Sequence, residues 1–215
     1  VYLIGEGVYN GVIQLAGTGE FLGYFAVNDA DLTFSQRLQQ LLFTRAQLAN
    51  LVDINPTVFT NVFVDKSGIV YTATSGTNRN GMKKHSTNGG NMFKTNVWSY
   101  DTLTDVYVDD DGLIYTSSAE GYINVYSKNG EEIFSFGSYV TTVDISGLFT
   151  SLPSLAVDRN GNIWCVDGSK GYLQSFKPTE YAQMVYSAMN LYEEGRYSEA
   201  MVQWNEVLKL NQMSI

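Results

Sequence analysis

The sequence predicts a mainly β protein, a partial β-propeller of about three and a half four-stranded blades with one inter-blade helix, followed by a helical hairpin. Two observations support this fold class. A strand–turn–strand unit recurs with glycines at 68, 112 and 161, which are 44 and 49 residues apart. This spacing is close to the roughly 40 to 50 residues of a propeller blade. After residue 179 the apolar period changes from two to about 3.6 residues, which is typical of helices.

The three copies of the unit occupy residues 62–71, 106–115 and 155–164. Each alternates apolar and polar residues on either side of an Asp-x-x-Gly turn, as half-buried strands of a hairpin do. A second hairpin follows each copy and turns at Asn88-Gly89 and at Asn129-Gly130, whereas its last version, from Gly171 to Phe176, is shortened. We therefore place the propeller at residues 1–178 and the helical region at 179–215.

The N-terminal residues fit the same template from its second strand onward, with a turn near Thr18-Gly19. The 69 residues from Tyr2 to Tyr71 exceed one repeat by 25, and the segment 31–53 accounts for the excess. Its leucines fall at helical spacing before Asn55-Pro56, so it is expected to be an amphipathic insertion between blades. Because the pattern starts inside a blade, the ring needs further blades or a second copy. Open strand edges favour self-association.

The unit Asp-x-x-Gly-x-Ile-Tyr/Trp, followed by a Gly-led strand and an Asn-Gly turn, resembles the NHL repeat of six-bladed propellers. With its helical insertion and Pro56, the chain further resembles bacterial exported NHL propellers that continue into tetratricopeptide (TPR) repeats. Residues 191–208 are similar to one TPR unit, with Gly195 at the inter-helix turn, Ala200 at a close helix contact and Trp204 at the large-residue position. The resemblance implies a binding scaffold at an extracytoplasmic or cell-surface location.

The charge balance argues against nucleic acid as a partner. The chain has 13 basic and 22 acidic residues and a net charge of -9, which repels phosphate backbones. One basic cluster, Arg79, Lys83, Lys84 and His85, is interpreted as a solvated hairpin edge, with a phosphate site as the alternative. Apolar runs are too short to span a bilayer, so any membrane link is expected outside this chain. Cys165, the single cysteine, lies in an apolar run and is expected to be a buried thiol.

No catalytic residue, metal or cofactor is predicted. His85 is the single histidine, and we expect it to face solvent on a strand. The turn aspartates lack the ligand spacing of a calcium loop, so they are assigned to hairpin geometry. The alternative function is a metal-dependent sugar lactonase or lyase like the gluconolactonase-like propellers, for which Glu6, Glu120 and Asp167 are the candidate ligands.

The predicted function is a non-catalytic scaffold that binds a protein or carbohydrate ligand on one propeller face and a protein partner on the TPR. Most aromatic residues, such as Tyr71, Tyr115 and Trp164, occupy a repeated core position. Others fall on loops at one end of the blades, where propellers commonly bind ligands. The candidate ligand-binding residues are Tyr9, Arg79, Asn80, Tyr122 and Tyr172.

Overall fold

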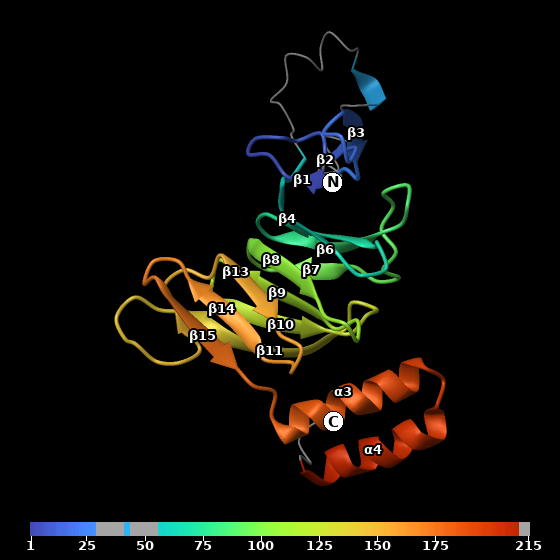
Figure 1. The fold of residues 1–215 in the computed structure, drawn as a ribbon, viewed down its shortest axis with the longest axis vertical. Coiled ribbons are helices and arrows are strands. Elements are labelled where there is room, and N and C mark those ends of the chain that lie inside the picture. The colour runs from blue at the N-terminus through green and yellow to red at the C-terminus, as the bar shows by residue number, and fades with distance from the viewer. Residues whose placement is uncertain (29–40, 44–55, 211–215) are drawn as a thin grey trace. The chain divides into compact units, whose positions relative to one another are not determined.

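The computed structural model describes residues 1–28, 41–43 and 56–210. Within these ranges the protein is mainly β, with its named helices confined to the C-terminal end (Figure 1). This confirms the predicted fold class at the level of a mainly β chain. The helix expected over residues 31–53 falls outside the described residues, apart from 41–43.

The strands form four sheets, each connected in sequence order. The first sheet is β1 (Tyr2–Leu3), β2 (Val12–Leu15) and β3 (Phe21–Phe25), and the second is β4 (Phe59–Val64), β5 (Val70–Thr74), β6 (Asn78–His85) and β7 (Val97–Ser99). The third is β8 (Leu103–Val108), β9 (Ile114–Ser118), β10 (Tyr122–Tyr126), β11 (Glu132–Tyr139) and β12 (Leu148–Phe149). The fourth is β13 (Ser154–Val157), β14 (Ile163–Asp167) and β15 (Tyr172–Phe176). Neighbouring strands are antiparallel where their register is defined, except that β12 runs parallel to β11.

The three Asp-x-x-Gly turns share one geometry. In the third sheet, one carboxylate oxygen of Asp109 accepts hydrogen bonds from the backbone N–H groups of Asp111 and Leu113, both at 2.9 Å. Asp65 and Asp158 accept the equivalent pairs at 2.8 to 3.0 Å. The turn glycines have φ of 81°, 88° and 76°, a region that glycine adopts readily. The aspartates therefore close hairpins, as the sequence predicts.

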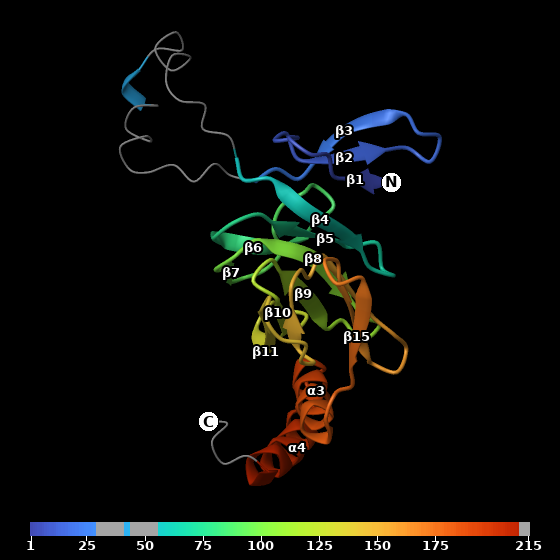
Figure 2. The ribbon, with the colours of Figure 1, turned by 90° about the vertical axis from the view of Figure 1, so that its left-hand side faces the viewer.

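A bulge recurs in the first strand of the second and of the third sheet. Thr60 is the extra residue between the β4 pairs Phe59–Thr74 and Asn61–Ala73, and Thr104 is its counterpart on β8. The hydroxyl of Thr60 donates to the carbonyl oxygen of Leu103 at 2.5 Å, and that of Thr104 donates to Leu152 at 2.6 Å. The second and third sheets thus meet along their first strands, and β4 and β8 lie side by side in Figures 1 and 2.

An apolar cluster fills the space between the second and third sheets. Its members come from both sheets: Tyr71, Ala73, Met82, Val97, Leu103, Val106, Val108, Ile114 and Tyr126. The thiol of Cys165 is also buried, as predicted. Tyr71 and Tyr115 are buried core residues as predicted, but the prediction was wrong for Trp164, which is 42% exposed. Tyr71 is covered by residues of the following sheet, whereas Trp164 lies on the last described sheet.

The environment of His85 contradicts the expectation of a solvent-facing side chain. The residue is 2% exposed and packs edge-on against Phe25 and Phe59. Its Nε2 lies 2.8 Å from the Thr72 hydroxyl and its Nδ1 lies 2.9 Å from the carbonyl oxygen of Gly89. Burial lowers the pKa of His85 to about 4. Strand residues alternate between faces, so Lys83 and His85 both turn inward and the expected basic edge is divided.

Helices α3 (Glu180–Glu193) and α4 (Tyr197–Leu210) form a hairpin. The Thr179 hydroxyl caps α3 by accepting from the N–H of Ala182 at 3.2 Å, and Gly195, with φ of 78°, turns the chain between the helices. The residues buried on the two helices are Val185, Ala188, Ala200 and Val207. No helix of the described residues is long and apolar enough to cross a membrane.

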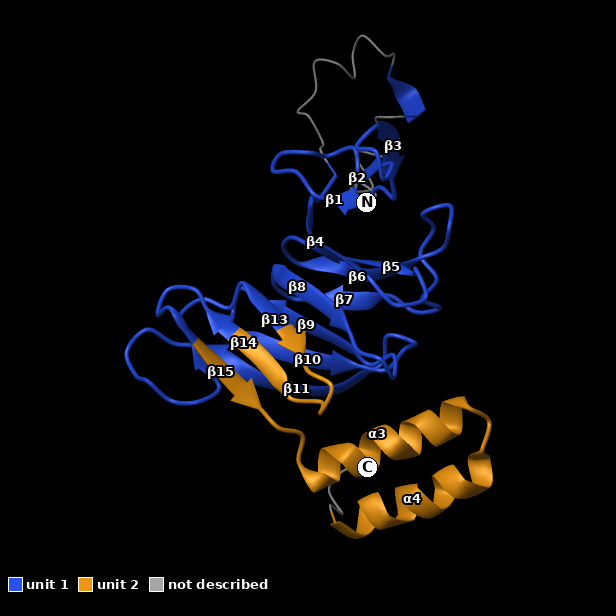
Figure 3. Ribbon diagram, viewed as in Figure 1, with its two compact units in different colours: residues 1–155, 166–172 blue, residues 156–165, 173–215 orange. Residues whose placement is uncertain are grey.

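The chain divides into two compact units, which Figure 3 distinguishes by colour. One comprises residues 1–155 and 166–172, and the other comprises 156–165 and 173–215. The predicted boundary between residues 178 and 179 stays a prediction.

Candidate functional site

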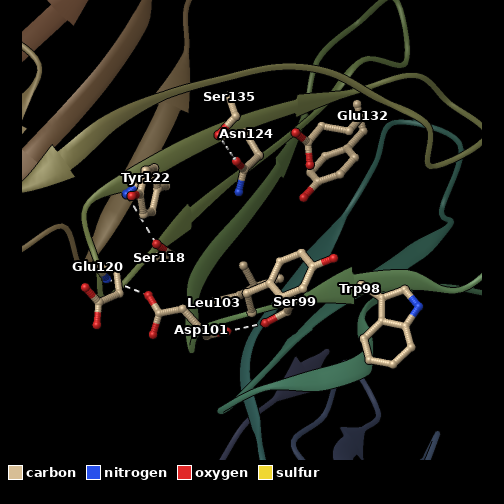
Figure 4. A pocket seen from close by; sticks show the side chains of 12 residues that line it. Trp98, Ser99, Asp101, Leu103, Ser118, Glu120, Tyr122, Asn124, Glu132 and Ser135 are labelled. Carbon is tan, nitrogen blue, oxygen red and sulfur yellow. Dashed lines mark hydrogen bonds between the residues drawn. The ribbon is translucent and has the colours of Figure 1, made fainter.

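A pocket of about 510 Å³ lies between the second and third sheets, within the first unit (Figure 4). Its walls come from the end of β7, the loop that leads into β8, the turn between β9 and β10, and the strands β10 and β11. The lining residues are Trp98, Ser99, Tyr100, Asp101, Leu103, Ser118, Glu120, Tyr122, Asn124, Tyr126, Glu132 and Ser135. We call it the aromatic pocket.

Three aromatic side chains of the aromatic pocket are largely in contact with solvent. Trp98 is 52% exposed, Tyr100 is 86% exposed and Tyr122 is 44% exposed. Large aromatic groups usually bury most of their surface, because each offers a large apolar area. Aromatic faces held open at a pocket are available to stack on a ligand.

Hydrogen bonds fix the two loops next to these rings. The carboxylate of Asp101 accepts from the backbone N–H groups of Thr102 and Glu120, both at 2.5 Å, and so ties the β7–β8 loop to the β9–β10 turn. The Ser118 hydroxyl accepts from the N–H of Tyr122 at 3.2 Å. The pocket rim is therefore built from two loops that are joined to each other.

The polar lining of the aromatic pocket offers mainly oxygen atoms. Ser135 donates to Oδ1 of Asn124 at 2.7 Å (Figure 4), and the Asn124 amide nitrogen donates to the Thr116 hydroxyl at 3.4 Å. Burial, with the nearby carboxylate of Glu132, raises the pKa of Tyr126 to about 12, so its hydroxyl keeps its proton at neutral pH. The lining contains Asp101, Glu120 and Glu132 but no lysine, arginine or histidine. Such a pocket suits a neutral or cationic ligand with hydroxyl or amine donors.

The predicted binding residues occupy several places. Tyr122 lines the aromatic pocket, whereas Tyr9 lies in the loop between β1 and β2. Arg79 and Asn80 lie on β6, where the Asn96 amide, oriented with its nitrogen toward Asn80, donates to that residue at 2.8 Å and accepts from the Arg79 guanidinium at 3.1 Å.

Tyr172 lies at the start of β15 and has its own charged neighbours. Its hydroxyl donates to Asp144 at 3.3 Å, and the ammonium of Lys170 lies 5.6 Å from its ring centre. The Lys170 ammonium lowers the pKa of the Asp144 carboxyl through a hydrogen bond. Tyr172 therefore belongs to a separate surface cluster and does not line the aromatic pocket.

The three candidate metal ligands also differ in their surroundings. Asp167 is fully buried and accepts from the backbone N–H groups of Thr150 and Lys170 at 2.8 and 3.0 Å, which gives it a role in loop closure. Glu6 is exposed in the β1–β2 loop, and Glu120 lines the aromatic pocket. Over the ranges that the structure describes, no three His, Cys, Asp or Glu side chains lie close enough together to hold a metal ion.

Sequence reasoning did not single out Trp98 and Tyr100. Both lie in the segment that joins two repeats, where the copies differ most and the template gives no equivalent position. A signal was present in Trp98-Ser99-Tyr100-Asp101, because two large aromatics at alternate positions next to a turn both face one side of a strand end.

Comparisons with known proteins give the fold and no family. No protein-family model matches the chain, and no curated protein matches it. Among solved structures, the chain is similar to the extracellular domain of BT4673, a one-component system of B. thetaiotaomicron, at 12% identity and a TM-score of 0.50 over 81% of this chain and 21% of that one. It is also similar to a protein of unknown function from Bacteroides caccae, at 13% identity and a TM-score of 0.45 over 82% of this chain and 57% of that one.

The chain thus spans about a fifth of the length of the BT4673 domain. At 12% identity the likeness to the BT4673 domain concerns the fold alone, and it agrees with a propeller-like protein of successive antiparallel sheets. The fold and the aromatic pocket together define the class as a propeller-like β protein.

Proposed function

We propose that this chain is a non-catalytic recognition protein whose propeller-like sheets bind a carbohydrate in the aromatic pocket. The observation that carries the proposal is the set of three exposed rings, Trp98, Tyr100 and Tyr122, in or next to two loops joined by Asp101. Sugar rings present apolar C–H faces that stack on aromatic groups, and their hydroxyls donate to carboxylate and amide oxygens. The alternative ligand of the same pocket is a protein whose exposed loop offers similar hydrogen-bond donors.

The finer architecture belongs to the same proposal. The shared turn geometry of Asp65, Asp109 and Asp158 supports reading the sheets as NHL-type blades, about three and a half in number. The α3–α4 hairpin, with buried Ala200 and a turn at Gly195, supports reading the C-terminal helices as one TPR unit. That unit would bind a protein partner.

The proposed location is extracytoplasmic or at the cell surface. The BT4673 chain is an extracellular domain, and this chain has a comparable fold. Self-association through the open edges of the terminal sheets is a further part of the proposal, because an unpaired strand edge offers free N–H and C=O groups. Sedimentation velocity of the purified chain over a range of concentrations measures this self-association.

Binding of neutral oligosaccharides to the purified chain tests the function. Calorimetric titration should give saturable binding that Trp98→Ala and Tyr122→Ala each weaken about two- to tenfold, because aromatic stacking contacts contribute about 0.5 to 1.5 kcal/mol. Tyr139→Ala is the matched control, since Tyr139 is 50% exposed on the same sheet but does not line the pocket. Equal losses in all three variants would contradict the proposal.

A second assay addresses the alternative of a metal-dependent lactonase or lyase. The purified chain is incubated with sugar lactones with and without divalent cations, and product is measured. Turnover that requires a metal and is lost in Glu120→Gln would replace the recognition proposal with the enzyme.

A further inference from the structure

A second pocket, of about 340 Å³, has the opposite charge to the aromatic pocket. It lies between the segment that follows β6 and the β10–β11 turn, within the first unit. Three lysines line it, Lys84, Lys94 and Lys128, together with one carboxylate, that of Glu131. We call it the basic pocket. Its excess of positive charge contrasts with the net charge of -9 of the whole chain.

The repeat brings two of these lysines together. Lys84 lies near the end of β6, and Lys128, 44 residues later, follows the equivalent strand β10 of the next sheet. The ammonium of Lys84 donates to the carbonyl oxygen of Lys128 at 3.4 Å and lies 5.6 Å from the centre of the Tyr71 ring. Both of these partners are uncharged. These two contacts hold the Lys84 ammonium in place, and they do not neutralise its charge.

The pocket walls are fixed before any ligand binds. Lys84 accepts at its carbonyl oxygen from the N–H of Met92 at 2.7 Å, which returns the segment alongside β6. The opposite wall is the turn at Gly130, where a Cβ would lie 3.0 Å from the Phe93 ring, so the turn packs directly on that side chain. A rigid pocket loses little entropy when it binds a ligand.

We propose that the basic pocket binds a compact oxyanion, a carboxylate or phosphate group of a small ligand or of a larger one. Lysines of two sheets line it, and charge-assisted hydrogen bonds to an oxyanion are stronger than neutral ones. The basic pocket shares no lining residue with the aromatic pocket, so this site does not depend on the ligand bound there. The basic cluster considered from the sequence as a phosphate site does not form one surface. Lys83 and His85 are buried, and only Lys84 of that cluster lines the basic pocket.

Amide chemical shifts of the full chain, titrated separately with inorganic phosphate and with glucuronate at low ionic strength, test the proposal. We expect saturable shifts at Lys84, Lys94 and Asn129, with affinity that falls as salt is added. Lys94→Gln should weaken binding about threefold or more, and Lys84→Gln with Lys94→Gln about tenfold or more. Glu131→Gln should strengthen binding, which loss of folding cannot mimic. Tighter binding of phosphate than of glucuronate indicates a phosphate ligand, and the reverse order indicates a carboxylate ligand.

Lys177→Gln is the matched control, because it removes the same charge at an exposed position outside the pocket. It should leave the affinity unchanged within about twofold. The proposal is overturned if neither anion shifts these amides, if Lys177→Gln weakens binding as much as Lys94→Gln, or if Glu131→Gln has no effect.

Discussion

The carboxylate of Asp109 accepts a hydrogen bond from the hydroxyl of Tyr115 at 2.9 Å, six residues along the chain. The same relationship joins Asp65 to the Tyr71 hydroxyl at 3.4 Å and Asp158 to the Trp164 indole N–H at 3.1 Å. Each aspartate therefore closes its turn with one oxygen and anchors the aromatic residue of the next strand with the other. The repeat needs Tyr or Trp at this position because phenylalanine has no donor.

Loss of the Asp109 carboxylate should destabilise the protein more than loss of the Tyr115 hydroxyl. Asp109→Ala removes the acceptor of two backbone N–H groups and of the hydroxyl, which predicts a decrease of about 2 to 4 kcal/mol in the free energy of unfolding. Tyr115→Phe removes one hydrogen bond and predicts about 1 kcal/mol. Urea denaturation measures both. Asp111→Ala, at an exposed neighbouring position, should stay within about 0.5 kcal/mol; a comparable loss there would refute the assigned role.

Local turn chemistry explains why the strands could be predicted. The Asp-x-x-Gly and Asn-Gly signals act within a few residues, so Gly68, Gly112 and Gly130 mark turns without knowledge of the fold. Burial of one face against another sheet is a long-range effect. Trp164 carries the same local signal as Tyr115 but is 42% exposed, because local signals do not say which sheet covers a side chain.

The candidate site was predictable only in part for the same reason. Tyr122 follows a turn that the repeat identifies, whereas Trp98 contributes to the pocket because β7 packs beside the next sheet. Likewise, the sequence places Lys83, Lys84 and His85 together, but strand alternation sends Lys84 to a pocket and its neighbours to the interior. Both pockets form where one sheet packs beside the next, and residue types alone do not predict this packing.

The stability of the protein should fall as the pH falls from about 6.5 to about 4. The unfolded chain takes up a proton at His85 with the ordinary pKa of 6.5, whereas burial lowers the pKa of His85 to about 4 in the folded chain. The unfolded state then binds more protons, so acidification favours it, by about 3 kcal/mol in all if this pKa difference is fully expressed.

Urea denaturation at several pH values tests this dependence. His85→Gln should be less stable at pH 7, because it disturbs the contacts to Thr72 and Gly89, but its stability should change less between pH 6.5 and 4. The other groups that titrate in this range affect both proteins equally, so the difference between the two stability profiles reports on His85. Parallel profiles would show that His85 does not titrate in this window.

Two glycines that share a positive φ should differ in their tolerance of alanine. Gly112 has φ of 88° and room for an added Cβ, whose nearest neighbour, Cβ of Lys128, would lie 3.6 Å away. Gly121 has φ of 78°, and its Cβ would lie 2.6 Å from the carbonyl carbon of Ser138. Gly112→Ala thus predicts a loss of about 1 to 2 kcal/mol from backbone strain, and Gly121→Ala predicts about 3 kcal/mol or more because backbone must also move. Equal melting temperatures for the two variants would contradict the close approach at Gly121.

The helical hairpin depends on the small size of Ala200. This residue is buried on α4, and Ala188 is fully buried on α3, so neither site has room for a larger side chain. Ala200→Leu should overpack the hairpin by about 1 to 3 kcal/mol and reduce amide-exchange protection along both helices. Asn205→Leu, which places a leucine at an exposed position of α4, is the control and should keep protection unchanged. If Ala200→Leu exchanges as slowly as the control, the helices do not require close contact at this residue, and the support that Ala200 gives to the TPR assignment is lost.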